Sequence, residues 1–249
     1  MNVRAIVVGF GAVVAACSDD AGPYCGAHEL LRDQRSSLCI SAHELAKRST
    51  TAIIASQEEL DAAEALIRTT LPALRPTFAW VPRAASWYQT RGLVELVVTD
   101  PGIEAAWANG LAPSGNEVVD RVVEELDVWD FSSAVHSPAG HSFALWSRGA
   151  PSARNVQQAL QGVAGVEVIV WSELDPNATN VVDEGIDPTD GSRAVTYSIG
   201  WEDCAFLCRF AHHWRTKVGA DGTAFLVTDW GDALPAALVE ALATPEPML

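Results

Sequence analysis

The sequence has few positive charges. Lys and Arg together number 16, against 32 Asp and Glu, and the formal net charge is −16 over 249 residues. No cluster of Lys or Arg offsets this excess of acid. Because a phosphate backbone repels a surface of this sign, the composition excludes nucleic acid as a partner.

Long apolar runs are missing after the N-terminus. A membrane-spanning helix needs about 18 or more consecutive apolar residues, and no such run follows residue 16, which excludes a polytopic membrane protein. Hydrophobic residues still make up 49% of the chain, so it is not wholly disordered. The length suits one large domain or two small ones.

Motifs for nucleotide binding and nucleophilic catalysis are also missing. Neither Gly-x-Gly-x-x-Gly nor a phosphate-loop sequence occurs. The stretch at 140–144, Gly-His-Ser-Phe-Ala, is close to a nucleophile elbow, but Ser142 is expected at the start of a strand instead of a strand-to-helix turn. The sequence therefore favours a protein that is not an enzyme, with no catalytic residue and no cofactor.

The N-terminus is typical of a signal peptide. Residues 1–16 contain one Arg followed by an uncharged apolar run that is too short for a comfortable membrane span. The run ends in Val14-Ala-Ala-Cys17, which resembles the lipobox of bacterial lipoproteins. An ordinary secretory signal cleaved near Ala16, or a buried N-terminal strand, is the alternative.

The lipobox resemblance implies a location. In bacterial lipoproteins the matching cysteine, here Cys17, is diacylated and becomes the mature N-terminus, and two acyl chains suffice for stable anchoring. Asp directly after that cysteine can favour retention in the inner membrane, whereas this chain has Ser18. We therefore expect a lipid-anchored protein of the bacterial cell envelope, held at the outer membrane, whose membrane contact is the N-terminal lipid.

Four further cysteines follow, namely Cys25, Cys39, Cys204 and Cys208. An even number in an exported protein favours disulfide bonds. The spacing suggests that Cys25 pairs with Cys39 and Cys204 with Cys208, although four cysteines allow three pairings.

Metal binding is the competing interpretation of these cysteines. His28 and His43 follow the first two at short spacing, which gives the ligand types of a tetrahedral zinc site. Cys204, Cys208 and His212 recur every four residues and would share one face of a helix. The segment 214–218 alternates like a strand, which argues against that helix, and an oxidising compartment favours the disulfides.

The C-terminal part carries the most distinctive motif. Gly200-Trp201-Glu-Asp203-Cys204 and Cys208, followed by His212-His213-Trp214 and Asp221-Gly222, resembles a motif of uncharacterised bacterial exported proteins and lipoproteins, Gly-Trp-Gly-Asp-Cys-Pro-x-Gly-Cys. The resemblance covers the chain from about Asn155 onward and implies no established activity. This chain departs from the motif at Glu202, Ala205 and Leu207. The candidate binding residues are Trp201, Asp203, His212, His213 and Trp214.

Periodicity predicts an α+β fold. From residue 93 the order is strand, helix, strand, strand, helix, strand, which is that of a ferredoxin-like βαββαβ unit. A C-terminal antiparallel β extension and an N-terminal helical and linker segment complete the expected architecture. The expected divisions are a signal peptide at 1–16, a lipid-anchored tether and Cys-stapled linker at 17–55, a helical segment at 56–92, the ferredoxin-like unit at 93–172, an acidic loop at 173–191, and the β extension with its disulfide loop at 192–249.

Binding is the function that the sequence favours. The chain has nine Trp, and exposed Trp is a frequent anchor of interfaces, so we expect an envelope protein or peptide as partner. One alternative is a metal-binding protein or metal-dependent enzyme centred on Asp203, Cys204, Cys208, His212 and His213. Another is a protease-inhibitor-like module, because a ferredoxin-like unit in an exported protein resembles subtilisin-type propeptides and inhibitors.

Overall fold

The computed structural model describes residues 37–74, 78, 92–137, 140–149, 151–169, 180–202 and 208–244. Within these residues the protein is a mixed α+β structure with two antiparallel four-stranded sheets, six α-helices and one short 3-10 helix. The expectations for the signal peptide and for Cys17, Cys25, Asp203 and Cys204 lie outside the described residues.

The first sheet is built from one continuous part of the chain. Its elements follow in the order β1 (Leu93–Val98), α3 (Pro101–Trp107), α4 (Glu117–Glu125), β2 (Val128–Ser137), β3 (Gly140–Ser147), α5 (Ala153–Ala159) and β4 (Val166–Ile169). The strands lie in the order β2-β3-β1-β4, and each neighbouring pair is antiparallel. The predicted mixture of strands and helices is present here, with two helices, α3 and α4, between β1 and β2.

Side-chain caps explain where α3 and α4 begin. The Asp100 carboxylate accepts the backbone N–H groups of Gly102 and Ile103, and a proline occupies the first turn of α3. At α4, the Asn116 side chain caps the helix by accepting the backbone N–H groups of Val118 and Val119. Both helices bury apolar side chains against the sheet, including Trp107, which lies edge-on to Phe143 at 5.3 Å.

The second sheet is an antiparallel meander of β5 (Asn180–Ile186), β6 (Arg193–Trp201), β7 (Phe210–Val218) and β8 (Ala224–Gly231), in that order. β5 lies inside the segment 173–191, so the expectation of an acidic loop is wrong for 180–186. The acidic side chains of β5 are compensated across the sheet, because Asp183 binds Arg193 and Glu184 binds Arg215. Val181, earlier on the same strand, is buried in the core.

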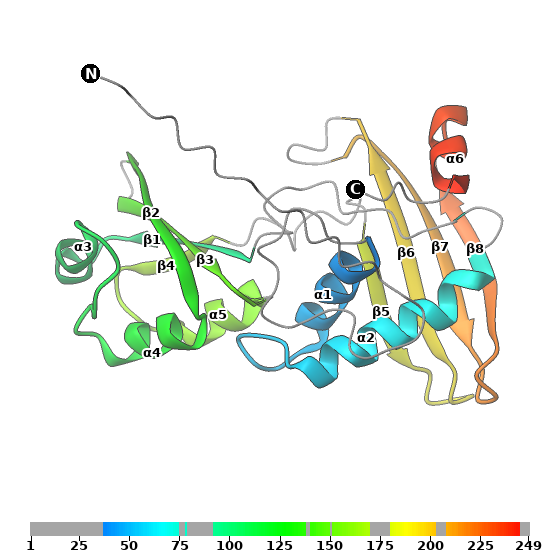
Figure 1. The fold of residues 1–249 in the computed structure, drawn as a ribbon, viewed down its shortest axis with the longest axis horizontal. Coiled ribbons are helices and arrows are strands. Elements are labelled where there is room, and N and C mark those ends of the chain that lie inside the picture. The colour runs from blue at the N-terminus through cyan, green and yellow to red at the C-terminus, as the bar shows by residue number, and fades with distance from the viewer. Residues whose placement is uncertain are drawn as a thin grey trace, which may run out of the picture.

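The N-terminal helices cover one face of the second sheet. α1 (Ser37–Ser49), α2 (Gln57–Thr70) and the 3-10 helix η1 (Leu71–Leu74) precede the first sheet in sequence, and their apolar side chains share a core with β6 and β7. Figure 1 shows α1 and α2 beside this sheet. The second unit therefore combines segments from both sides of 92–169, which the expected linear division of the chain did not include.

Residues 50–54 connect the two units. Asn155 at the start of α5 donates from Nδ2 to the carbonyl oxygens of Thr50 and Ala52, at 2.9 and 2.6 Å. Ile53 packs in the core of the first unit, and Ile54 forms an isolated bridge with Pro151. The segment after α1 therefore docks on the first unit before the chain returns to the second one through α2.

A last helix, α6 (Ala236–Ala243), follows β8 and was not predicted. Its Leu242 is buried in the core of the second unit. In the part of the chain that the structure describes, none of the helices combines the length and apolar character needed to cross a bilayer.

Candidate functional site

β7 carries two neighbouring histidines on opposite faces of the second sheet. Successive side chains of a strand point to opposite faces. Trp214 is buried beneath the helices, and the ring of His212 lies on the same face, 4.4 Å from the Trp214 ring. His213 lies on the other face. The two imidazoles are thus separated by the sheet, which does not suit two ligands of one metal ion.

His212 is held at the end of β8. Its Nδ1 lies 2.8 Å from the backbone carbonyl oxygen of Asp232, and its Nε2 lies 3.5 Å from the Asp229 carboxylate. The Asp232 carboxylate in turn accepts the backbone N–H of Ala211. These contacts give His212 a structural role in joining β7 to the end of β8.

His213 sits between a serine and a tryptophan. Its Nδ1 lies 2.7 Å from Ser198 Oγ, and its ring stacks on Trp230 with centroids 5.1 Å apart. Burial of the ring, and after it the charge of the neighbouring His212, lower the pKa of His213 below its ordinary value, against an opposing effect of Asp232. The neutral ring can accept the Ser198 proton, but Ser198 is only 5% exposed, so its hydroxyl is poorly placed to attack a substrate.

The two tryptophans predicted for binding have different surroundings. Trp214 is a core side chain that lies edge-on to Phe78 at 4.7 Å, so it presents no exposed ring. Trp201, at the end of β6, is partly buried and stacks on Phe210 at 5.9 Å. The aromatic surface that the sequence led us to expect around residues 201–214 is therefore mostly turned inward.

The described cysteines offer no free thiolate. Cys39 and Cys208 are both buried and both disulfide-bonded. Cys25 and Cys204 lie outside the described residues, so the expected pairing stays a prediction. Among the residues that the structure describes, no group of three or more His, Cys, Asp or Glu side chains could hold a metal ion.

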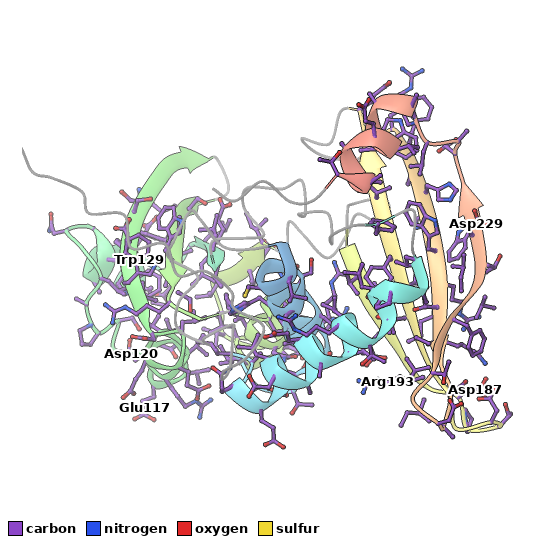
Figure 2. The ribbon with its side chains drawn as sticks, turned by 45° about the vertical axis from the view of Figure 1, so that its right-hand side comes forward. Glu117, Asp120, Trp129, Asp187, Arg193 and Asp229 are labelled. Atoms are coloured by element: carbon purple, nitrogen blue, oxygen red, sulfur yellow. The ribbon has the colours of Figure 1, made fainter. Side chains whose placement is uncertain are left out.

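Charged side chains form ion pairs on the outer face of the second sheet and at the end where the β5–β6 turn lies. Lys217 on β7 reaches both Asp187 and Asp190, each at 3.2 Å, in the turn between β5 and β6. Hydrogen bonds from the Thr189 side chain and backbone, with that of Lys217, lower the pKa of Asp187 to about 2. Figure 2 shows Asp187 and Arg193 at this end of the sheet. The charged groups here are thus engaged with one another.

β8 exposes a strip of large apolar side chains. We call Phe225, Leu226, Val227 and Trp230 the β8 strip; they are 49%, 44%, 44% and 44% exposed. The described residues contain three other exposed large hydrophobic side chains, each on a different element, namely Trp129, Ile186 and Val239. The concentration of four such residues on one strand distinguishes β8 from the rest of the described surface.

The position of β8 at the end of the strand order explains this exposure. β7 is its only strand neighbour in the described residues, and although η1 and α2 approach the strand, every residue from 225 to 231 is exposed. A β-bulge shifts the register between Arg215 and Thr216, which leaves Val227 opposite no β7 residue. In Figure 2, Asp229 marks β8 at the outer edge of the sheet.

The β extension expected at 192–249 includes β8, but no binding role was expected for this strand. Its sequence nevertheless carries a signal of exposed apolar surface. Ala224-Phe-Leu-Val227 is a continuous apolar run, whereas a strand with one solvated face alternates apolar and polar residues. In a strand at the edge of a sheet, such a run leaves apolar side chains exposed.

Comparison with protein-family models, with curated proteins and with solved structures gave no match to this chain. The function is therefore inferred from the fold and from the geometry of β7 and β8.

Proposed function

We propose that this protein is a lipid-anchored protein of the bacterial cell envelope that acts by binding, with the β8 strip as its binding surface. The exposure of four large apolar side chains on one edge strand carries the proposal. Clusters of exposed apolar side chains mark interaction sites, and aromatic residues are enriched at the centres of interfaces. Trp230 supplies such an aromatic anchor.

Anchoring at Cys17 is the second part of the proposal. The apolar run at 1–16 and the lipobox-like Val14-Ala-Ala-Cys17 support diacylation, and Ser18 supports the outer membrane. Disulfide bonds at Cys39 and Cys208 are consistent with an oxidising compartment. The pairs Cys25–Cys39 and Cys204–Cys208 belong to this proposal.

We also propose that residues 92–169 form a ferredoxin-like unit. The antiparallel order β2-β3-β1-β4, with helices between β1 and β2 and between β3 and β4, supports this assignment. A protease-inhibitor role rests on fold analogy alone, and no separate contact in this unit favours it.

Photocrosslinking in intact cells tests the binding function. A benzophenone amino acid at Val227 is expected to give a discrete adduct with a protein that peptide mass analysis identifies. The same amino acid at Ile186, which is equally apolar and more exposed at 67% but lies on β5, is the matched control and should give none. If the two positions give the same products, the β8 strip is not a binding surface.

A further inference from the structure

We infer that the groove between α5 and the free edge of β4 binds a short extended peptide, which adds to the first sheet as a further strand and carries a basic side chain. This site is separate from the β8 strip, so the inference does not depend on the proposed function. β4 is the last strand in the order β2-β3-β1-β4, and β1 is its only strand neighbour in the described residues. A peptide that adds to such an edge gains backbone hydrogen bonds, and pockets beside the edge select its side chains.

The backbone of β4 directs hydrogen-bonding groups away from β1. Thr99 donates its N–H to the Gly165 carbonyl oxygen at 2.7 Å, so these two residues form a hydrogen-bonded pair. Along an antiparallel ladder such pairs alternate with pairs whose backbone groups point outward, and the register places Val166 and Val168 in the outward positions. The Val166 N–H lies 3.4 Å from the Val163 carbonyl oxygen. The Val166 carbonyl and both backbone groups of Val168 therefore face the open edge.

The edge of β4 is regular. Its register with β1 has no shift, whereas β2, at the other edge of the same sheet, and β8 both pair with shifts. The side chains of Val166 and Val168 pack in the core beneath the helices, so no charge of β4 points inward, and residues 166–169 contain neither Lys nor Pro. Because β4 has only four residues, the strand that it can accept is short.

A cavity of about 310 Å³ lies beside this edge. The buried side chains of Leu160 and Val168 line it, together with three carboxamides from α5 and the turn that follows, namely Gln157, Gln158 and Gln161. Because the side chains of a strand alternate between its faces, a peptide residue opposite Val168 directs its side chain into this cavity. Carboxamides both donate and accept hydrogen bonds, so the cavity suits an uncharged side chain.

The charge beside the cavity favours a basic residue next to the uncharged one. Glu167 is exposed and is the one charged side chain among the described residues that line the cavity. It points to the opposite face of the sheet from Val168, so it meets the side chain of the neighbouring peptide residue. The net charge of −16 also attracts a basic peptide and repels an acidic one. The expected ligand therefore alternates uncharged side chains with Lys or Arg.

Peptide binding to the full-length chain in detergent tests this inference. The probe is Thr-Lys-Thr-Lys-Thr, blocked at both ends and labelled for fluorescence anisotropy, and its symmetric pattern suits either strand direction. Thr-Glu-Thr-Glu-Thr should bind roughly tenfold more weakly. Glu167→Gln should weaken binding of the Lys peptide about threefold. Glu124→Gln is the matched control, because it removes another exposed carboxylate, from α4, and should leave the affinity unchanged.

Methylation of the peptide backbone distinguishes strand addition from a general attraction between opposite charges. A methyl group on the nitrogen of the central Thr removes the N–H that the Val168 carbonyl would accept, so binding should weaken roughly fivefold. A methyl group on either Lys nitrogen, which faces away from β4, should have a much smaller effect. Hydrogen exchange locates the site, since the Val168 amide should exchange more slowly when the peptide is bound.

The inference is overturned if methylation weakens binding equally at every position, or if exchange of the Val168 amide is unchanged at saturating peptide. Protection of this amide that rises with protein concentration, without peptide, would assign the edge to a second copy of the chain and would overturn it as well. None of these measurements involves the β8 strip, so the failure of this site leaves the proposed function to its own test.

Discussion

Tyr197 joins the second sheet to α2 through its hydroxyl group. The side chain is buried, and its Oη lies 2.5 Å from Oγ1 of Thr70, which also donates to the Leu66 carbonyl oxygen at 2.8 Å. Burial raises the pKa of Tyr197 well above its usual range, so the phenol stays protonated. Because the one proton of the Thr70 hydroxyl goes to Leu66, the phenol can donate to Thr70 Oγ1, in a core where each polar group needs a partner.

Removing this hydroxyl should have a small cost. In Tyr197→Phe, Thr70 keeps its bond to Leu66 and no donor is left unpaired, so we expect a loss of about 1 kcal/mol in the free energy of unfolding. Tyr197→Leu also loses the packing against Phe78 and should cost roughly 3 kcal/mol. Denaturant unfolding measures both, and equal losses in the two variants would show that the hydroxyl matters as much as the ring.

His213 predicts a pH dependence of stability. Burial lowers its pKa in the folded protein from the ordinary value of 6.5, so the unfolded chain binds a proton more readily. The free energy of unfolding should therefore be highest at pH values above the pKa of His213 in the unfolded chain. It should decline as the pH falls from that pKa to the lower pKa of His213 in the folded protein. In His213→Gln this part of the decline should disappear, as measured by unfolding at about pH 7.5 and about pH 5. An unchanged profile in the variant would assign the dependence to other groups.

For single residues, the sequence identified the candidate side chains but did not show which face of the sheet each one lies on. Adjacent histidines in a strand must lie on opposite faces, and this much follows from periodicity. Which of the two faces the helices depends on the packing of Trp214 against Phe78, from a segment far away in the sequence. The interior position of Trp214 could therefore not be derived from its own motif.

Secondary-structure elements with local signals were the easiest to predict. Ser56-Gln-Glu-Glu59 has the sequence pattern of a capping box, and the structure contains one: the Ser56 backbone N–H donates to the Glu59 carboxylate at 2.7 Å, and Ser56 Oγ accepts the Glu59 backbone N–H at 3.2 Å. Such reciprocal bonds satisfy two backbone donors at the start of α2. Since the signal and the structure both span only four residues, the sequence suffices to locate it.

Ser56→Ala should destabilise the protein by about 1 kcal/mol through the loss of this cap. Thr69→Ala is the matched control, because Thr69 is exposed and its hydroxyl bonds only to the Ala65 carbonyl oxygen of its own helix. Thermal unfolding of the two variants gives the comparison. A cap that contributes nothing would leave Ser56→Ala as stable as the control.

Elements stabilised by distant partners were missed. The residues of β5 read as an acidic loop because its carboxylates dominate the local pattern, and the arginines that neutralise them lie on β6 and β7. α6 has no side-chain cap at its N-terminus and depends on Leu242 in the core of the second unit. The Ala and Leu residues of α6 favour a helix, but no cap marks where it begins.

Over the whole molecule, the arrangement of the two units was the least predictable feature. The chain builds α1 and α2, leaves to form residues 92–169, and returns to build the sheet that those helices cover (Figure 1). Apolar periodicity shows that a helix has a face to bury but not which sheet covers it. The elements of the first unit were easier to predict because they are consecutive in the sequence.

Anchoring is a property of the whole molecule and has its own test. Cys17→Ser removes the thiol that would carry diacylglycerol, so the variant should leave the membrane fraction, whereas wild type should stay there and carry the added lipid mass. Ser18→Ala is the control, since it keeps the thiol. Cell fractionation measures the membrane location, and intact-mass analysis measures the added lipid. A wild-type chain without added lipid mass would refute lipidation of Cys17.

The central claim is that β8 is occupied in the envelope and exposed in the isolated chain. Hydrogen exchange of the backbone amides at 224–231 tests it most directly, comparing the protein in native envelope membranes with the same protein solubilised and diluted. We predict that these amides are protected in the envelope and exchange faster after dilution, while those of β6, in the interior of the same sheet, exchange equally slowly in both samples. Equal exchange of β8 in the two samples would contradict the claim.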